Sequence, residues 1–256
     1  MYRRLPRIFI PFLLLCFFPG PGAQSETEFQ IGEKIKYGIY FGGIHMASQT
    51  MEIVSKERLN QSDVYKIVGR TKSSLLMSLF YRLDDKWIVY LDRDTLLPVR
   101  VEKDMREGKQ SGYFIYDIDQ DKRRVAILYP QEDKAKKVIP FSKDLFDIIS
   151  LAYFMRAALP SYDVRGDTFS VDFLEPTKVK TVAFRNQGIE KIALPRSSHK
   201  GRFETHHFKQ IGSYEIEFFI DCDEEHLPLK LFVSSRFLVI DLNIEAILLE
   251  YSNPRL

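Results

Sequence analysis

The sequence predicts a mainly β protein, a curved antiparallel sheet or half-barrel built from two similar halves with one central amphipathic helix. Three observations predict this fold. Short extended segments recur at regular spacing along the chain, one segment near the middle has helical spacing instead, and one hairpin motif occurs twice. Short strands separated by turn residues at such intervals are typical of an antiparallel sheet, a barrel or a sandwich.

The first residues have the three parts of a secretory signal. Arg3, Arg4 and Arg7 form a basic end, residues 8–18 are mostly apolar, and helix-breaking residues then lead to the small Ala23. The apolar part is too short to span a bilayer, which needs about 20 residues. We therefore expect a signal peptide over residues 1–23, cleaved near Ala23, and an exported, periplasmic protein without a transmembrane segment in its mature chain.

The composition of the mature chain excludes some classes of partner. Removing residues 1–23 takes away three arginines and no acids, so the formal charge falls from +2 to −1 (34 basic against 35 acidic side chains). This balance indicates no nucleic-acid partner. The mature chain keeps one cysteine, Cys222, so no intramolecular disulfide can form. Its stability must come from a core, and we expect a single β-rich domain over residues 24–256.

The extended segments are rich in β-branched and aromatic residues, and turn-forming residues separate them. Several alternate in polarity: Trp87, Val89 and Leu91 fall on one face of their segment. The predicted strands cover residues 34–41, 50–54, 64–68, 86–91, 98–101, 112–117, 124–128, 168–173, 179–184, 214–220 and 229–233.

The segment from 144 to 160 lacks this pattern of extended segments and turns. It predicts an amphipathic helix of about three turns at 144–159. Asp147 is placed to cap its start, with Ser150 three residues on, and Pro160 ends it. This helix would join two related halves at about 31–140 and 161–251. Its apolar residues recur at helical spacing: Ile148, Ile149, Ala152 and Met155 or Leu159.

The repeated hairpin motif occurs at IVYLDRDTLLPVRVEKD and again at EFFIDCDEEHLPLKLFVSS. Each copy has an apolar strand, Asp-x-Asp, a short polar tip, Leu-Pro and a second strand with alternating apolar and basic residues. The aspartates suit a tight turn, and the proline suits the start of a return strand. The order of these residues indicates an internal duplication. The matching residues are Asp92 and Asp94 with Asp221 and Asp223, and Leu97-Pro98 with Leu227-Pro228.

Four segments in this order resemble the bacterial exported family known only as domain of unknown function 3108. They are an opening strand at 32–37, the turn at 41–47, the central helix at 146–156 and the late hairpin at 227–230. The resemblance covers roughly residues 31–234. The family usually has a proline where this chain has Ile148, and a tryptophan where this chain has Phe218 or Phe219.

This resemblance implies a curved, mostly antiparallel sheet around a central helix, like the half-barrels of envelope lipoprotein carriers. It implies no established activity and carries over no catalytic residue. The residues themselves agree, since we find no nucleophile motif, phosphate loop or metalloprotease motif in the sequence. We expect a non-enzymatic protein with no cofactor and no metal.

The polar clusters have structural explanations. The tip at 221–226 could offer oxygen ligands to calcium, or Cys222 and His226 to zinc, but the earlier copy has no cysteine or histidine and a solvated hairpin is the simpler interpretation. The neighbouring acids would raise the pKa of Cys222 and quench it as a nucleophile. His206 and His207 are adjacent, so in a strand they face opposite sides and cannot chelate one ion.

Two basic segments can be interpreted as solvated loops. Residues 134–137 have neighbouring acids and are expected in an exposed loop. Residues 196–202 could meet anionic lipid headgroups or polysaccharide, or form a solvated loop.

An apolar segment at 73–81 lies where a polar turn is expected between two strands. It would either close one end of the sheet over the helix or form the lip of an apolar cavity. For a ligand site on the concave face, the sequence favours Leu76, Met77, Phe80, Tyr153 and Phe154 as lining residues. The expected function is an envelope protein that binds an apolar or lipid-like ligand. The alternative is a structural or assembly factor that binds an envelope protein or polysaccharide.

Overall fold

The computed structural model describes residues 28–130, 134–212, 215–237 and 240–255. The expected signal peptide and its cleavage position near Ala23 lie outside the described residues. No helix among the described residues has both the length and the apolar character needed to cross a bilayer.

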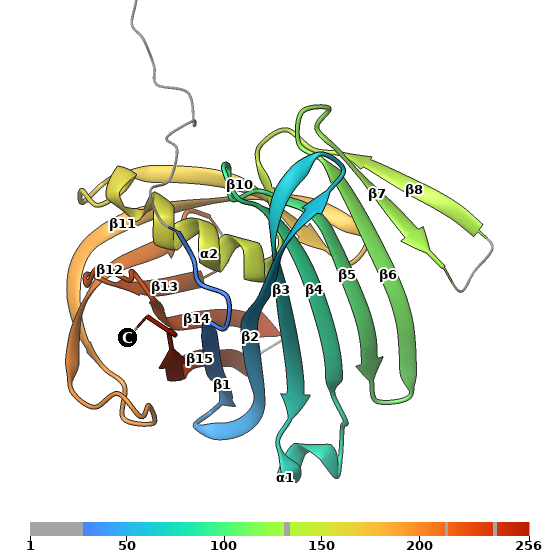
Figure 1. The fold of residues 1–256 in the computed structure, drawn as a ribbon. Coiled ribbons are helices and arrows are strands. Elements are labelled where there is room, and N and C mark those ends of the chain that lie inside the picture. Colours follow the sequence, from blue (N-terminus) through green and yellow to red (C-terminus); the bar gives the residue numbers. More distant parts are fainter. Residues whose placement is uncertain (1–27, 131–133, 213–214, 238–239, 256) are drawn as a thin grey trace, which may run out of the picture.

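Within the described residues, fifteen strands form one open sheet that curves around a helix (Figure 1). Neighbouring strands pair antiparallel except the short β9, which is parallel to β10. This confirms the predicted mainly β fold. The strands are β1 (Lys34–Phe41), β2 (Ile44–Leu59), β3 (Ser62–Ser73), β4 (Asp84–Asp92), β5 (Pro98–Glu107), β6 (Gln110–Asp119), β7 (Arg124–Tyr129), β8 (Lys134–Pro140), β9 (Leu145–Phe146), β10 (Thr168–Glu175), β11 (Lys178–Ala193), β12 (Arg202–Gln210), β13 (Glu215–Asp221), β14 (Pro228–Phe237) and β15 (Ile240–Ser252).

The strand order brings the two ends of the described chain together in the middle of the sheet. Strands β1 to β8 follow one another outward to one edge, and β15 back to β9 follow one another to the other edge. The two series meet where β1 pairs with β15, from Lys34 opposite Ser252 to Phe41 opposite Ile244. A pairing between residues so far apart in sequence carries a high loop-closure cost, which the packing of the core must offset.

The two series resemble one another in the lengths of their strands. β1 and β10 have 8 residues each, β2 and β11 have 16 each, and β5 and β14 have 10 each. The repeated hairpins β4–β5 and β13–β14 also share a backbone turn, since φ is positive just before Leu-Pro in both, at 55° for Leu96 and 45° for His226. In each, the first aspartate donates its N–H to the leucine carbonyl at 2.9 Å, Asp92 to Leu97 and Asp221 to Leu227.

The central helix α2 (Ile148–Ala158) lies where the sequence predicts it. Asp147 caps its start, accepting hydrogen bonds from the N–H groups of Ile149 and Ser150, while the Ser150 hydroxyl accepts one from the Asp147 N–H. This reciprocal pair satisfies donors that a helix start leaves unpaired. The chain then leaves the helix through the 3-10 turn η1 (Leu159–Ser161), which contains Pro160.

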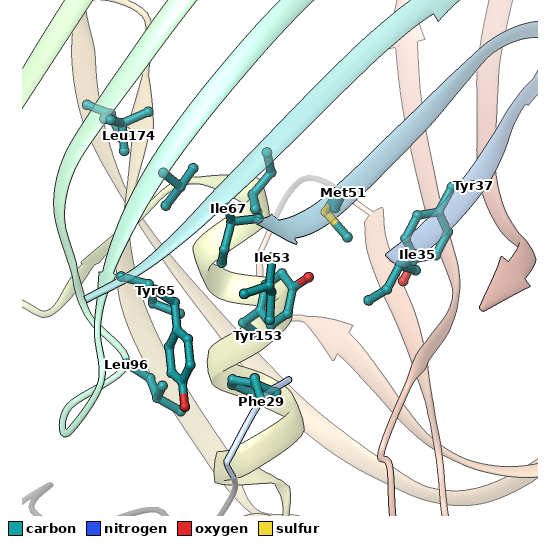
Figure 2. Packing of buried hydrophobic residues seen from close by; sticks show 14 of the residues in the cluster. Phe29, Ile35, Tyr37, Met51, Ile53, Tyr65, Ile67, Leu96, Tyr153 and Leu174 are labelled. Atoms are coloured by element: carbon teal, nitrogen blue, oxygen red, sulfur yellow. The ribbon is translucent and has the colours of Figure 1, made fainter. Parts of the chain in front are cut away.

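The core lies between α2 and the concave face of the sheet. Tyr153 points from α2 into the core, and the Phe29 ring packs edge-on against it at 5.1 Å between centroids (Figure 2). Tyr65 on β3 contacts the same phenylalanine at 5.8 Å. Gly69 on β3 allows the helix to approach closely, because a Cβ there would lie 2.5 Å from Cδ1 of Ile149. Aromatic packing of this kind dominates the burial of apolar area.

Two sequence expectations are wrong. Residues 134–137 are not a loop, because they belong to the edge strand β8. Residues 73–81 do not close the sheet over the helix, because the short helix α1 (Leu75–Ser78) buries none of its residues and projects at the end of the β3–β4 hairpin (Figure 1). Strands β9, β12 and β15 were absent from the predicted set.

Candidate ligand pocket between the helix and the sheet

A pocket of about 510 Å³ lies between α2 and the concave face of the sheet, at the junction of the two strand series. Small-molecule sites typically occupy about 300–1,000 Å³ and are lined mainly by apolar side chains. The wall of this pocket fits that description. Its apolar residues are Tyr37, Ile39, Met51, Tyr81, Leu83, Trp87, Ile148, Ile149, Leu151, Ala152, Met155, Phe218, Ile220, Pro228, Leu231 and Ala246.

The helix supplies one wall because its apolar stripe is wider than the core needs. Ile149 and Met155 are buried, whereas Ile148 at the start of the helix is 44% exposed although it is a large aliphatic residue. Between them in sequence, Ala152 also lines the pocket, and it has the smallest side chain of the helix residues that do so. The stripe predicted from helical spacing is therefore partly a pocket wall.

The inner part of the pocket is lined by buried side chains. Met51 on β2 and Ile220 on β13 are fully buried there. Tyr37 on β1 donates its hydroxyl to the Pro228 carbonyl at 2.7 Å, and burial raises the pKa of Tyr37 above its usual value. The hydroxyl therefore stays a neutral donor that is already used by the protein. The most exposed lining side chains, Ile148 and Tyr81, mark the sides where the pocket reaches solvent.

A group of charged residues lies at one end of the pocket. Lys103 on β5 lies 3.0 Å from Asp85 and 3.3 Å from Glu107, and its ammonium sits 4.6 Å from the centroid of the Trp87 ring. Asp85 also accepts a hydrogen bond from the Arg106 N–H at 2.8 Å. Lys103 thus pairs with both carboxylates, one ammonium against two acids, and the more exposed carboxylate is that of Glu107. The polar residues that line the pocket are Gln49, Thr71, Asp85, Glu107 and Lys230.

None of the five residues favoured from the sequence lines this pocket. Leu76 and Phe80 are exposed on or next to α1, and Met77 is half-buried there. Tyr153 is fully buried in the core next to the pocket, and its hydroxyl has no hydrogen-bond partner among the described residues. Phe154 packs against Phe146, with ring centroids 4.7 Å apart. The residues favoured from the sequence lie on the same helix and the same hairpin as several lining residues, among them Ala152 and Leu83, but they are not the residues that line the pocket.

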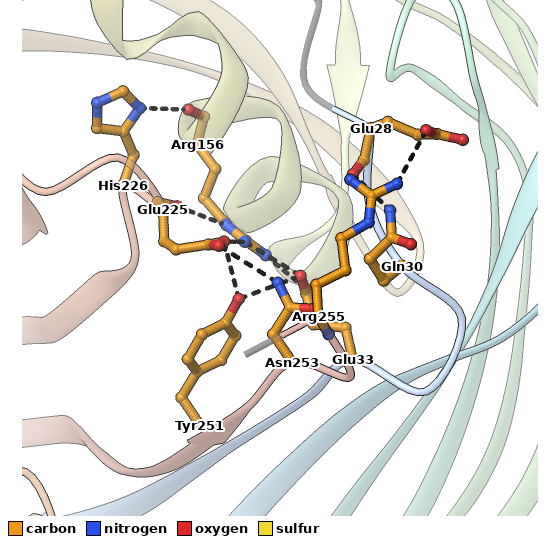
Figure 3. Close-up of polar contacts among 9 residues, drawn as sticks. All are labelled: Glu28, Gln30, Glu33, Arg156, Glu225, His226, Tyr251, Asn253 and Arg255. Atoms are coloured by element: carbon orange, nitrogen blue, oxygen red, sulfur yellow. Dashed lines mark hydrogen bonds and ion pairs between the residues drawn. The ribbon is translucent and has the colours of Figure 1, made fainter.

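A second polar cluster, which the sequence did not reveal, holds α2 at the junction (Figure 3). Arg156 on α2 donates two hydrogen bonds to the Glu33 carboxylate and two to Glu225 in the β13–β14 turn, one to its carboxylate and one to its backbone carbonyl. Tyr251 at the end of β15 donates to Glu225 at 2.8 Å. The guanidinium also lies 4.8 Å from the Phe29 ring centroid. The one signal in the sequence was an arginine within an otherwise apolar helix.

The β13–β14 turn has a structural role that its sequence did not suggest. His226 donates from Nδ1 to the Arg156 carbonyl at 3.0 Å, so it ties the turn to α2 (Figure 3). Burial, followed by the carboxylates of Asp221, Glu204 and Asp223, raises the pKa of the Cys222 thiol, as expected from the sequence. A thiol of this kind is a weak nucleophile at neutral pH.

The two adjacent histidines face opposite sides of β12, as predicted. His206 is buried beside Asn186, and burial lowers the pKa of its imidazole. His207 contacts Glu217 at 2.8 Å and stacks on Phe219. Over the described parts of the chain, no group of three or more histidine, cysteine, aspartate or glutamate side chains is arranged to hold a metal ion.

Comparison with known proteins identifies similar chains. The family model described as "Protein of unknown function (DUF3108)" matches residues 36–239. No curated protein matches the chain. Among solved structures, a β-barrel-like protein of domain of unknown function DUF1849 from Brucella abortus is 7% identical, with a TM-score of 0.55 over 88% of this chain and 99% of that one. A "putative exported protein with YmcC-like fold" from Bacteroides fragilis is 8% identical, with a TM-score of 0.37 over 90% and 100%.

Proposed function

The chain belongs to the DUF3108 family of proteins of unknown function, and we propose that it is an exported, non-enzymatic envelope protein that binds an apolar or lipid-like ligand. The ligand would occupy the pocket between α2 and the concave face of the sheet. The single observation that carries this proposal is the apolar pocket of about 510 Å³ beside the central helix. Export is proposed from the basic, apolar and small-residue pattern of residues 1–23.

The chemistry of the wall selects the ligand class. Around the inner pocket, the buried side chains of Met51, Ile149, Met155 and Ile220 offer no hydrogen-bond donor and no acceptor stronger than a thioether sulfur. A ligand there gains free energy from removing apolar area from water, about 0.8 kcal/mol for each buried methylene group. A polar ligand would lose its hydration without compensation. The pocket therefore suits an alkyl or acyl chain.

The polar residues near one end favour an amphiphile. Asp85 and Glu107 line the pocket there, and both face Lys103. A ligand with one polar end could place that end near this paired group and near solvent, with its chain inward. A hydrocarbon chain of this orientation should bind more tightly as it lengthens, by roughly fourfold per methylene group until the pocket is full.

Native mass spectrometry of gently purified protein tests the proposal. We expect a population whose mass exceeds that of the chain by one lipid-sized molecule, and loss of that molecule after extraction with organic solvent. Delipidated protein should then bind long-chain fatty acids more tightly than short-chain ones. The proposal would be refuted if the purified protein carries no ligand and binds fatty acids of every length equally weakly.

The alternative function is a structural or assembly factor that docks a protein partner on a sheet edge. Within the described residues, β8 pairs on one side only, with β7. Its sequence, KAKKVIP, carries three lysines and ends in Pro140, and these residue types discourage pairing with another strand. This edge therefore favours the ligand proposal over the assembly proposal.

A further inference from the structure

The end of the β3–β4 hairpin exposes an unusual amount of apolar surface. We define the apolar tip as residues 75–81, which include α1 (Leu75–Ser78). Leu75 is 86% exposed, Leu79 is 75% exposed and Phe80 is 81% exposed, and Leu76 and Tyr81 are also exposed. Large apolar residues scattered singly over a surface need no explanation, but five within seven consecutive positions do.

The fold holds the apolar tip in this exposed position. Ser74 caps α1 by accepting a hydrogen bond from the Met77 N–H, and its own N–H donates to the Met46 carbonyl at 2.8 Å. On the other side, the Gly108 N–H donates to the Arg82 carbonyl at 2.7 Å. The tip is therefore fixed to β2 and to the β5–β6 turn. None of the four α1 residues is buried, so the tip contributes little to the core.

Basic side chains surround the apolar tip. Lys72 and Arg82 flank it in sequence, and Lys109 lies in the β5–β6 turn that contacts it; all three are exposed. The nearest acid in sequence, Asp84, forms an ion pair with Arg70 at 2.8 Å and lies within the field of Lys72 and Arg82, so basic side chains outnumber acids here. This arrangement leaves a positive rim around an apolar centre.

A second basic segment lies at the same end of the sheet (Figure 1). The loop between β11 and β12 carries Arg196 and Lys200, and Arg202 follows at the start of β12. The Arg196 guanidinium lies 4.6 Å from the centroid of the Tyr40 ring, which places this loop against the β1–β2 turn. Ser198 fixes the loop by donating to the Leu249 carbonyl at 2.7 Å.

We propose that this end of the sheet docks on an anionic phospholipid surface. The apolar tip would enter the acyl-chain boundary, and the basic residues of the rim and of the β11–β12 loop would contact lipid phosphates. Apolar insertion combined with attraction to anionic lipid is the physical basis of reversible membrane association. A short projecting tip with a positive rim can insert into a bilayer, because a bilayer does not need a complementary groove to accept it.

The apolar tip lies next to the pocket, so docking of the tip would also place the pocket near the bilayer. Tyr81, the last residue of the apolar tip, lines the pocket, and so does Leu83 two residues later. Docking would therefore bring one side of the pocket to the bilayer, so that an apolar ligand could pass between them with little exposure to water. This consequence rests on the proposed function, whereas the docking itself does not.

Vesicle flotation tests the docking alone. Protein freed of any bound lipid would be floated with vesicles of phosphatidylcholine, and with vesicles in which about a third of the lipid is phosphatidylglycerol. We expect binding to the anionic vesicles, weaker binding to the neutral ones, and release by high salt. The double variant Leu79→Ser/Phe80→Ser should bind anionic vesicles at least about tenfold more weakly, because it removes two of the three most exposed side chains of the tip.

The matched control removes two other exposed aliphatic side chains. Val164→Ser/Ile189→Ser changes residues that are 63% exposed outside the tip and should bind vesicles like the unchanged protein. Lys72→Glu/Lys109→Glu should remove the preference for anionic vesicles. No binding by the unchanged protein, or equal binding by the tip and control variants, would overturn the docking proposal. Fatty-acid binding measured without vesicles separates that failure from a failure of the proposed function.

Discussion

Arg156 on α2 and Glu33, the residue before β1, form a two-bond ion pair in the interior of the protein. Nη1 lies 2.6 Å from Oε1, Nη2 lies 3.2 Å from Oε2, and the two side chains are 2% and 1% exposed. This pair joins the central helix to the first strand beside the junction with β15. It therefore fixes the wall of the pocket that α2 provides.

Breaking this pair should destabilise the protein strongly. Glu33→Gln leaves the Arg156 guanidinium buried with only Glu225 as an acidic partner. We expect the free energy of unfolding to fall by about 3 kcal/mol, the lower part of the range for a broken buried pair. Urea denaturation followed by circular dichroism measures it. The exposed pair of Arg70 and Asp84 gives the control, since Arg70→Gln should cost no more than about 1 kcal/mol. Equal losses in the two variants would refute the assigned role.

The close contact between β3 and α2 predicts a compensating pair of substitutions. Gly69→Ala would place a Cβ 2.5 Å from Cδ1 of Ile149, so we expect a loss of about 1–3 kcal/mol from overpacking. Ile149→Val removes that Cδ1 and alone should cost about 0.5–1.5 kcal/mol. The double variant should be more stable than the sum of the two losses implies. Strict additivity in a double-mutant cycle would contradict the contact.

The cap of α2 predicts a pH dependence of stability. Burial raises the pKa of the Asp147 carboxyl above its usual value, although hydrogen bonds from Ser150 and from the backbone of Ile149 oppose the shift. A carboxyl whose pKa is raised on folding contributes most stability below its unfolded pKa of about 3.9, and that contribution is lost as pH rises through the folded pKa.

Asp147→Asn removes this titration while keeping an oxygen that can cap the helix. Relative to the unchanged protein, the variant should therefore gain stability as pH rises from about 4 to 7. Urea denaturation across that range measures the difference. A difference that stays constant with pH, or that falls, would be inconsistent with the raised pKa. Asp147→Ala removes the same titration and the cap as well, so it should be about 1–2 kcal/mol less stable than Asp147→Asn at every pH.

The hairpin cysteine should react slowly. Burial and nearby carboxylates raise the pKa of Cys222, so less thiolate is present at a given pH than in an unfolded chain. Alkylation by iodoacetamide at pH 8, followed by mass spectrometry, should be several-fold slower in the native protein than in urea. Asp223→Asn removes one of the charges and should speed the native reaction. A native rate equal to that in urea would contradict the environment described for Cys222.

Local chemistry made part of this fold predictable. The cap at Asp147 and the break at Pro160 define α2 because they depend on residues close together in sequence. The Leu-Pro hairpins were recognisable for the same reason, since each turn is made by its own residues. The edge strand β8 was missed because its lysines suit a solvated loop as well as a strand edge.

The pocket and the buried ion pair depend on contacts that sequence periodicity does not specify. Arg156 and Glu33 are 123 positions apart, and β1 meets β15 across nearly the whole described chain. The wall of the pocket combines residues of eight strands, β1 to β5 and β13 to β15, with one face of α2, so it follows from strand order and register. Apolarity alone favoured Leu76 and Phe80, which the fold instead leaves exposed at the apolar tip.

The central claim is that an apolar chain occupies the pocket beside α2. Trp87, the only tryptophan in the sequence, lines that pocket and reports on it directly. A brominated long-chain fatty acid should quench Trp87 fluorescence in delipidated protein, and the same acid without bromine should compete.

A substitution within the pocket wall provides the most direct measurement. Ala152→Phe fills the space beside the wall of α2, whereas Ala158→Phe adds the same side chain on the same helix outside the lining residues. We predict that Ala152→Phe abolishes the saturable quenching of Trp87 and that Ala158→Phe retains it. Quenching that is absent from the unchanged protein, or that persists equally in both variants, would contradict a ligand in this pocket.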